Sequence, residues 1–247
     1  MIMKLSPPFF EIGPKNLLRR REIETIAIAA GRAGRRFGVT VVMTVPTALI
    51  APVRDLDSGV AVYAQGMDSD NLGDSMFRVT AESLSDAGAD GVMLNHDSRP
   101  LPSDALTVAL ERCADVGLQT IVCAATASAA VDLAGCEPTA VLVEPTSLIG
   151  TTGTQRRPWI GPTTAAIHRV DAAVLAMHAG GVSTPMLAQS IMESGADGTG
   201  STSGVLNALD SPAAAEEFIA ATRAGWDHAH TSDGEDHLVT SPNTTQE

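Results

Sequence analysis

The chain has 247 residues, 44% of them hydrophobic, which is enough for one large core, and α/β barrels of this length commonly form a single domain. Asp and Glu number 29 against 16 Lys and Arg, and the formal charge of −13 argues against a protein that coats nucleic acid or an anionic membrane. No apolar run approaches the roughly 20 residues of a membrane span, and the start MIMKLSPPFF lacks the order of a signal peptide. We therefore expect a cytoplasmic protein.

The three cysteines are Cys113, Cys123 and Cys136. Their number is odd, their spacing is not CxxC, and no histidine adjoins them, so neither a disulfide framework nor a zinc site is indicated. We expect Cys123 to lie in a strand as a packing residue, and we expect no metal site.

Short apolar runs alternate with Ala-rich helical patterns along the chain. Eight runs have the character of buried strands: 8–12, 39–45, 60–65, 91–96, 119–125, 139–144, 172–180 and 196–201. Between them, apolar residues recur at spacings of three and four in the segments 21–38, 76–89, 103–117, 128–136, 163–170 and 183–196. This alternation predicts an α/β protein with a parallel sheet covered by helices, and eight such units favour a single (β/α)8 (TIM) barrel. A doubly wound open sheet is the alternative.

Two segments look alike, ESLSDAGADGVML and QSIMESGADGTGS, and each predicts a helix that ends in Gly-Ala-Asp-Gly before a strand. After Trp226 the sequence loses apolar periodicity. We therefore expect a barrel domain over residues 1–226 and a disordered tail over 227–247. The tail's histidines, His228, His230 and His237, fit a solvated segment better than a metal site.

In a (β/α)8 barrel the active site lies where the strands end, so the residues that close each apolar run are informative. The fourth run ends in Asn95-His96, the sixth in Glu144, the seventh in His178 followed by two glycines, and the eighth in Gly200-Ser201. Together they would place an imidazole, a carboxylate and two glycine-rich loops on one rim.

The glycine-rich loops AGGVST (179–184) and GSTSG (200–204) follow the last two predicted strands. Barrels of this class commonly bind phosphate there, through backbone N–H groups and a helix N-terminus. Glycines let the backbone approach an anion, and Ser183 and Ser201 could add hydroxyl donors. Either loop alone would fit an ordinary turn, but the pair favours a phosphate site.

Glu144 ends an apolar strand, where burial would raise its pKa toward the range of a general base. The loop after it, PTSLIGTTGT, fits a closing lid in which Gly150 and Gly153 bend. A salt-bridged structural glutamate is the alternative. His96 could polarise a carbonyl as a neutral imidazole, or simply be hydrogen-bonded in its setting.

Three segments resemble the triosephosphate isomerase family in its short archaeal-type form: AQGMDSDNLGDSMFRVTAESLSDAGADGVMLNHDSRPL, VEPTSLIGTTGT and AGGVSTPMLAQSIMESGADGTGSTSGV. The resemblance runs from about residue 39 to about residue 223 and preserves the order of the motifs. It implies a cofactor-free aldose–ketose isomerase of glycolysis that acts on a small phosphorylated sugar as a homo-oligomer, a dimer or tetramer. It assigns the base to Glu144 and the electrophile to His96. It gives the phosphate and substrate contacts to Gly150, Gly180, Gly181, Ser183, Gly200 and Ser201.

The first strand departs from the family, whose Asn-x-Lys motif offsets the substrate's negative charge. This chain has FFEIGPKNLL instead. Counting back from the second strand, Ile12 would occupy the lysine position, but we expect Lys15 to supply the cation through a turn at Gly13-Pro14. Glu11 would then either face the site or tuck into the base of the barrel.

Other departures surround the expected substrate. Asp97 and Ser98 stand where the family has Ser then Glu, His178 has no assigned role, and Arg156 and Arg157 could reach an acidic substrate or face solvent. A four-carbon tetrulose phosphate is therefore a competitor to glyceraldehyde 3-phosphate and dihydroxyacetone phosphate. One alternative function is a phosphosugar-binding protein without catalysis. A phosphate-binding lyase or synthase is a second alternative, which ranks after it.

Overall fold

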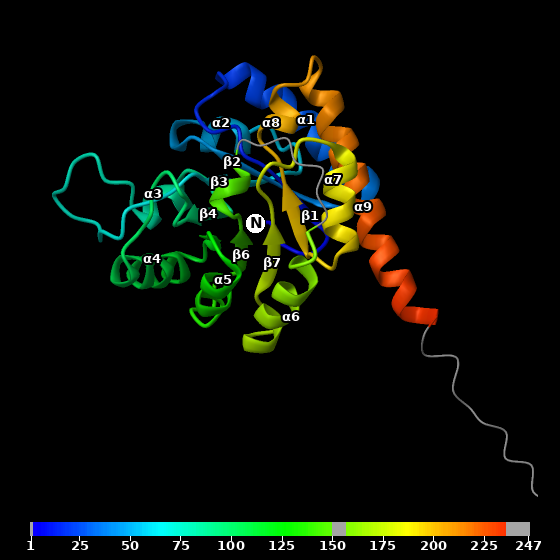
Figure 1. Cartoon of the computed structure of the whole chain (residues 1–247). Coiled ribbons are helices and arrows are strands. Elements are labelled where there is room, and N and C mark those ends of the chain that lie inside the picture. Colours follow the sequence, from blue (N-terminus) through cyan, green and yellow to red (C-terminus); the bar gives the residue numbers. More distant parts are fainter. Residues whose placement is uncertain (1, 150–156, 236–247) are drawn as a thin grey trace, which may run out of the picture.

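The computed structural model describes residues 2–149 and 157–235. In this part of the chain eight parallel strands close into a barrel in sequence order, and β8 pairs with β1 (Figure 1). The strands are β1 (Phe9–Ile12), β2 (Thr40–Val45), β3 (Ala61–Ala64), β4 (Gly91–Leu94), β5 (Gln119–Ala124), β6 (Ala140–Val143), β7 (Leu175–His178) and β8 (Gly198–Gly200). The predicted (β/α)8 barrel is confirmed, and the open sheet is wrong.

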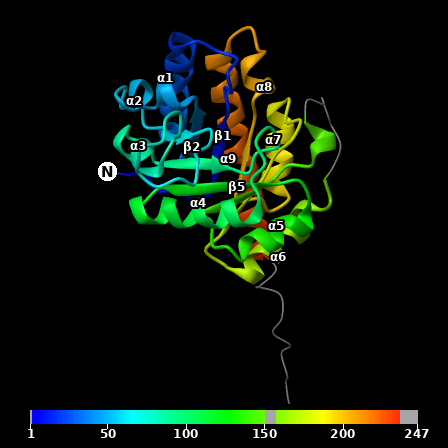
Figure 2. The same cartoon turned by 90° about the vertical axis from the view of Figure 1, so that its left-hand side faces the viewer.

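Helices form a layer outside the strands (Figures 1 and 2). They are α1 (Arg20–Phe37), α2 (Ile50–Arg54), α3 (Ala81–Asp86), α4 (Ser103–Val116), α5 (Ala127–Ala134), α6 (Ile160–Val170), α7 (Pro185–Glu193), α8 (Ser203–Leu206) and α9 (Ser211–Glu235), with 3-10 turns η1 (Thr47–Leu49) and η2 (Thr146–Leu148). The last helix, α9, packs against both α7 and α1. No helix of the described segments combines the length and apolar character needed to cross a membrane.

Several helices begin and end where local chemistry dictates. The side chains of Thr126 and Thr184 accept hydrogen bonds from backbone N–H groups in the first turns of α5 and α7. Gly38 and Gly117 end α1 and α4 in the left-handed conformation, with φ of 65° and 76°, which glycine adopts without steric cost. Because these signals lie in the sequence, most predicted helices are found close to their expected bounds.

The residues of β1 alternate between the outer layer and the barrel interior. Phe10 faces outward and stacks on Phe218 of α9, with ring centroids 5.7 Å apart. Side chains alternate along a strand, so Phe9 and Glu11 face inward. On β5, Cys123 is buried, as expected for a packing residue.

The two Gly-Ala-Asp-Gly segments play the same structural role twice. The Asp90 carboxylate accepts a hydrogen bond from the N–H of Val62 on β3 at 2.9 Å, and the Asp197 carboxylate accepts one from Ala176 on β7 at 2.7 Å. Each following glycine makes room for an interior ring. A Cβ on Gly91 would lie 2.6 Å from the ring of Tyr63, and one on Gly198 would lie 2.4 Å from that of Phe9.

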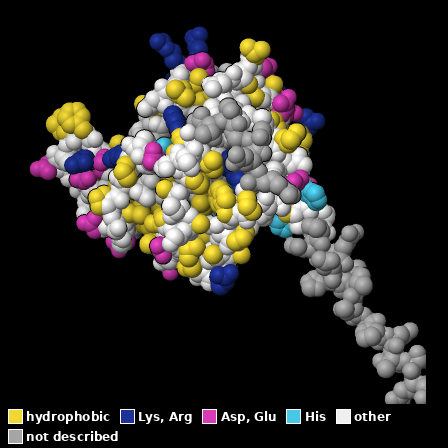
Figure 3. All heavy atoms as spheres, viewed as in Figure 1, with side chains coloured by type: hydrophobic (Ala, Val, Ile, Leu, Met, Phe, Trp, Pro, Cys, Tyr) yellow, Lys and Arg dark blue, Asp and Glu magenta, His cyan; other side chains and the backbone are white. Residues whose placement is uncertain are grey.

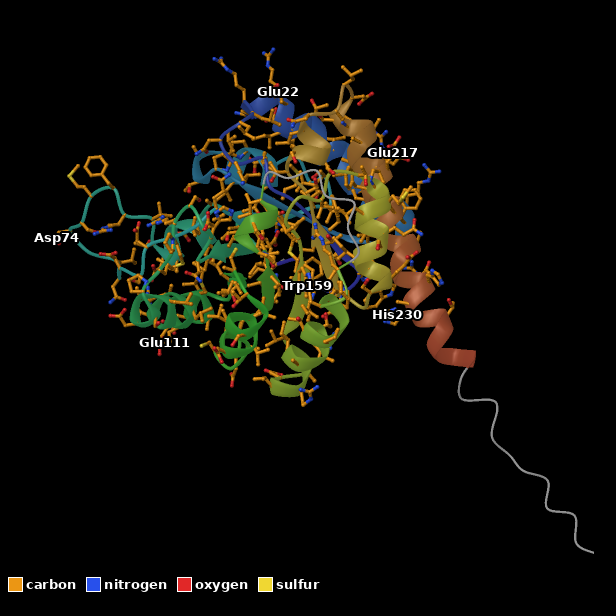
Figure 4. The ribbon with its side chains drawn as sticks, in the orientation of Figure 1. Glu22, Asp74, Glu111, Trp159, Glu217 and His230 are labelled. Atoms are coloured by element: carbon orange, nitrogen blue, oxygen red, sulfur yellow. The ribbon has the colours of Figure 1, made fainter. Side chains whose placement is uncertain are left out.

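The predicted helix over 76–89 is too long at its start, because α3 begins only at Ala81. Phe77 has φ of 64° and its side chain is 96% exposed, so the segment before α3 is a loop. Figure 1 shows this loop projecting away from the barrel, and Figure 4 labels Asp74 at its end. The apolar spacing over 76–89 suggested a buried helical face, but the structure exposes Met76 and Phe77 at the start of the segment.

The predicted boundary at Trp226 is also wrong, because α9 continues to Glu235. Arg223 pairs with Asp227 at 2.8 Å, and the ring of His230 stacks on Trp226 at 3.7 Å. Spacings of four residues along a helix bring such side chains together, so the helix continues without an apolar face. The tail prediction now concerns only residues 236–247, which lie outside the described residues.

Candidate active site

A cavity of about 350 Å³ opens at the carboxyl ends of the strands. Its lining residues come from almost every strand end: Glu11, Gly13, Lys15, Asn16, Thr44, Gln65, Met93, His96, Ser98, Leu142, Glu144, Ala179, Gly200, Ser201 and Thr202. The volume lies within the range of pockets for small metabolites. The three predicted catalytic residues, Glu144, His96 and Lys15, therefore share one cavity.

Glu144 directly follows β6, and its N–H donates to the carbonyl of Ala124 on β5 at 2.9 Å. Burial raises the pKa of its carboxyl, Lys15 and Arg157 oppose that rise, and Asp97 adds to it. A Cβ on Gly180 would lie 3.3 Å from Glu144 Cγ, so glycine there leaves space for the carboxylate. These conditions suit a general base.

The loop after β4 fixes His96 through its neighbours. Asn95, with φ of 57°, donates from its side chain to the Cys123 carbonyl at 2.9 Å and accepts from the Leu101 N–H at 3.0 Å. The Ser98 N–H donates to His96 Nδ1 at 3.1 Å. Since Nδ1 accepts this bond, the proton of the neutral ring is on Nε2, which leaves an N–H donor for a ligand.

The charge state of His96 follows from its surroundings. Burial lowers the pKa of the imidazole and the positive charge of Lys15 lowers it further, while Asp97 opposes both. The ring is therefore neutral near pH 7. Asp97 itself is exposed and acts on the site only through its charge.

The end of β1 and the loop after it bring Glu11, Gly13 and Lys15 to the cavity. Glu11 and Gly13 line the cavity, whereas Ile12 is fully buried and does not. The placement of Ile12 at the lysine position is thus wrong, because alternation along the strand turns it outward. Lys15 lines the cavity and itself has φ of 49°. Its backbone carbonyl accepts a hydrogen bond from Gln65 Nε2 at 2.9 Å.

Glu11 faces the site and does not lie in the base of the barrel. Its side chain is only 7% exposed. Burial raises the pKa of the carboxyl to about 7, the Thr44 hydroxyl and Lys15 lower it, and Glu144 raises it. Besides Glu144, the cavity therefore holds the carboxyl group of Glu11, whose pKa of about 7 lies near neutral pH.

The predicted phosphate loops meet at the rim, but their residues differ in role. Gly200 and Ser201 line the cavity, while Gly180, Gly181 and Ser183 are not among its lining residues. Ser201 Oγ donates to the Val182 carbonyl at 2.6 Å and accepts from the Gly204 N–H at 3.1 Å, so its hydroxyl joins the two loops. Gly150 and the lid glycine Gly153 lie outside the described residues.

Arg157 is a residue whose role the sequence did not reveal. It is 7% exposed and donates to the carbonyls of Ala179, at 2.8 Å, and Gly180. It therefore neither faces solvent nor reaches into the cavity, and it ties the chain before α6 to the loop after β7. Arg156 lies outside the described residues. The run QRRP gives no local indication of this burial.

His178 lies outside the site. Its side chain is fully buried, and its Nε2 is 2.9 Å from the Thr164 hydroxyl on α6. Burial lowers the pKa of the ring to about 3, and Arg157 contributes to the shift. Trp159 covers the ring with centroids 5.4 Å apart. Figure 4 labels Trp159 beside β7 and α6.

Across residues 2–149 and 157–235 the structure gathers no group of three His, Cys, Asp or Glu side chains that could hold a metal ion. In the segment predicted as a tail, His228 lies 3.2 Å from a Glu193 oxygen and His230 stacks on Trp226. His237 lies outside the described residues.

A carboxylate and a neutral imidazole that face one cavity at the strand ends define a (β/α)8 barrel equipped for acid–base chemistry. The family model described as triosephosphate isomerase matches residues 16–220. The chain therefore belongs to the triosephosphate isomerase family. This match begins earlier than the resemblance seen in the sequence and includes the loop after β1 and α1.

Two relatives in the family share about 30% identity with this chain over most of its length. The triosephosphate isomerase of Sulfurisphaera tokodaii is 30% identical over 220 residues, which cover 87% of this chain and 95% of the relative. That of Sulfolobus acidocaldarius is 29% identical over the same coverage. The crystal structure of triosephosphate isomerase from Bartonella henselae superposes with a TM-score of 0.68 at 18% identity, covering 87% of this chain and 99% of that one, and shows the shared fold. The chain is thus a divergent member.

Proposed function

We propose that the protein is an aldose–ketose isomerase that interconverts glyceraldehyde 3-phosphate and dihydroxyacetone phosphate through an enediolate. The observation that carries the proposal is the pairing of Glu144 and His96 across one cavity, with the His96 ring held neutral and its Nε2–H available. Relatives named triosephosphate isomerase support the same reaction.

We assign each residue a step. Glu144 takes a proton from the carbon beside the substrate carbonyl, and the Nε2–H of His96 donates to the oxygen on which charge develops. Glu144 then returns the proton to the adjacent carbon. Lys15 offsets the negative charge of the substrate and of the enediolate.

The phosphate group would lie against the backbone of the loop after β8, where Gly200 and Ser201 line the cavity. The hydroxyl of Ser201 is engaged in joining the loops, so we assign phosphate binding to backbone N–H groups rather than to this hydroxyl. The altered first strand keeps a four-carbon tetrulose phosphate as a second candidate substrate.

The test is turnover of glyceraldehyde 3-phosphate beside four- and five-carbon ketose phosphates, with Glu144→Gln as the inactive variant. Glu111→Gln on the outer surface of α4 is the matched control (Figure 4). Removal of a general base should lower kcat by at least about 10²-fold. Full turnover by Glu144→Gln would refute the mechanism. Binding of these ligands without exchange of solvent deuterium at carbon would favour a phosphosugar-binding protein instead.

We also propose that the protein is a homo-oligomer in the cytoplasm, where phosphorylated sugars are metabolised. The loop between β3 and α3 supports an oligomer, because it exposes Leu72, Met76 and Phe77, with 69%, 76% and 96% of their side chains in solvent. Figure 3 shows hydrophobic atoms gathered at the end of this projection. Light scattering on the purified protein and on Phe77→Asp would test it, and a monomeric wild type would refute it.

A further inference from the structure

Glu11 is a buried carboxyl group that the proposed mechanism leaves without a role. It lies on β1 between Val42 of β2 and Gly200 of β8, and it lines the same cavity as Glu144 and His96. A buried carboxyl without a partner is costly, so its position calls for a ligand or a structural contact.

No hydrogen bond of ordinary geometry accounts for it. Within residues 2–149 and 157–235, neither Glu11 Oε1 nor the Thr44 hydroxyl on β2 makes such a bond. The Thr44 hydroxyl nevertheless lies close enough to Glu11 to lower the pKa of its carboxyl. Both residues line the cavity, so two neighbouring buried polar atoms with incomplete hydrogen bonding face the space that a substrate would fill.

The surrounding backbone leaves room for this carboxyl group. A Cβ on Gly13 would lie 2.9 Å from Glu11 Oε1, and one on Gly200 would lie 3.0 Å from Glu11 Cβ. A larger residue at position 13 would crowd the Glu11 carboxyl, and one at position 200 would crowd the Glu11 backbone and Cβ. Glycines at both positions therefore leave room for Glu11 beside the cavity.

We propose that the Glu11 carboxyl, together with the Thr44 hydroxyl, hydrogen-bonds an oxygen atom on the carbon skeleton of the substrate, which makes Glu11 a substrate-binding residue. The ligand atom is a hydroxyl or carbonyl oxygen rather than the phosphate. This inference rests on the proposed function for its natural ligand, but its binding test does not require turnover.

The protonation state decides which hydrogen bond Glu11 makes. Burial raises the pKa of Glu11 and the Thr44 hydroxyl lowers it. Of the charged groups, Glu144 raises this pKa and Lys15 lowers it, and Cys123 lies close enough for its own pKa to be raised by Glu11. The adjoining strands β2 and β8 present Thr44 and Gly200, which do not titrate in this range. An anionic phosphate ester in the cavity would disfavour a further negative charge. In the complex Glu11 is therefore a neutral acid that donates from its O–H.

The test compares wild type with Glu11→Met, which keeps the length without polar atoms, and Glu11→Gln, which keeps the shape and a donor without titrating. Glu217→Gln on the outer face of α9 is the matched control (Figure 4). Calorimetry measures the affinities of inorganic phosphate and of glycerol 3-phosphate, which adds a hydroxylated carbon skeleton to the same anion. The ratio of the two affinities isolates contacts to the skeleton.

We expect Glu11→Met to reduce the preference for glycerol 3-phosphate about tenfold, the usual effect of losing one hydrogen bond, and Glu11→Gln to retain most of it. An unchanged ratio in Glu11→Met, or a wild type that binds both probes equally, would overturn the proposal. A changed ratio with no isomerase activity on any sugar phosphate would refute the proposed function while supporting this role for Glu11.

Turnover supplies a second readout that a merely structural Glu11 would not change. In the wild type kcat/KM should fall as pH rises through the titration of Glu11, because the donor is lost. That alkaline decline should be absent from Glu11→Gln and unaffected in Glu217→Gln. An identical alkaline decline in Glu11→Gln would count against the proposal.

Discussion

Replacing Glu11 by Gln should stabilise the protein at alkaline pH and leave its stability nearly unchanged in acid. Burial raises the pKa of this carboxyl from 4.5 to about 7. The folded chain therefore binds the proton more tightly than the unfolded chain, and stability falls as pH rises from about 4.5 to 7. At 1.36 kcal/mol per pH unit the loss is about 3 kcal/mol above pH 7, and Gln, which does not ionise, avoids it.

The assay is urea unfolding followed by tryptophan fluorescence at pH 5 and at pH 8.5, with Glu217→Gln as the control. The free energy of unfolding of Glu11→Gln should exceed that of the wild type by about 3 kcal/mol at pH 8.5 and by far less at pH 5. A difference of the same size at both values would mean that Glu11 acts through packing and not through its charge. Greater stability of the wild type at pH 8.5 would refute the argument.

Three further substitutions test the surroundings of the site. Arg157→Met removes a positive charge that lowers the pKa of Glu144, so the acid limb of the kcat/KM profile should move to higher pH. His178→Gln should make the free energy of unfolding less sensitive to acid. Burial lowers the pKa of the His178 ring to about 3, so the wild type loses stability as pH falls below about 6.5. Urea unfolding midpoints at pH 5 and pH 7.5 measure this difference. Gly225→Ala should cost about 1–3 kcal/mol in thermal unfolding, since a Cβ there would lie 2.3 Å from the Gln189 carbonyl oxygen where α9 packs on α7.

The barrel could be predicted because each strand and most helices have a recognisable pattern in their own stretch of sequence. Eight apolar runs of strand length alternate with amphipathic patterns, and parallel strands buried on both faces require such runs. The rule that the strand ends share one rim then brought Glu144 and His96 together, although 48 residues separate them in the sequence. Glu144 and His96 lie close in space because the barrel topology places the ends of β4 and β6 on the same rim.

What could not be predicted depends on contacts between segments. The burial of Arg157 arises only because the loop after β7 presents two carbonyls to it. The outward turn of Ile12 depends on where β1 enters the barrel, and an error of one residue reverses inside and outside. The extension of α9 to Glu235 rests on side-chain pairs within a helix that carries little apolar periodicity. The first two features leave no pattern in the local sequence, whereas the third leaves only the four-residue spacings of Arg223 with Asp227 and of Trp226 with His230, which apolar periodicity does not detect.

Substitution of Lys15 tests whether this residue supplies the positive charge that the Asn-x-Lys motif supplies in the family. The sequence contains only two lysines, Lys4 and Lys15. Lys15 lines the cavity and lowers the pKa values of Glu11, Glu144 and His96, so its ammonium group lies within electrostatic range of all three. Lys4 is exposed before β1, at the opposite end of the barrel, and Lys4→Met is the matched control.

Lys15→Met should lower kcat/KM about 10- to 100-fold, the usual effect of losing a charge-assisted hydrogen bond, and Lys4→Met should leave it unchanged. The same substitution should raise the pKa of Glu144, which would shift the acid limb of the rate profile to higher pH. Full activity of Lys15→Met would refute the assignment of Lys15 as the cation of this site.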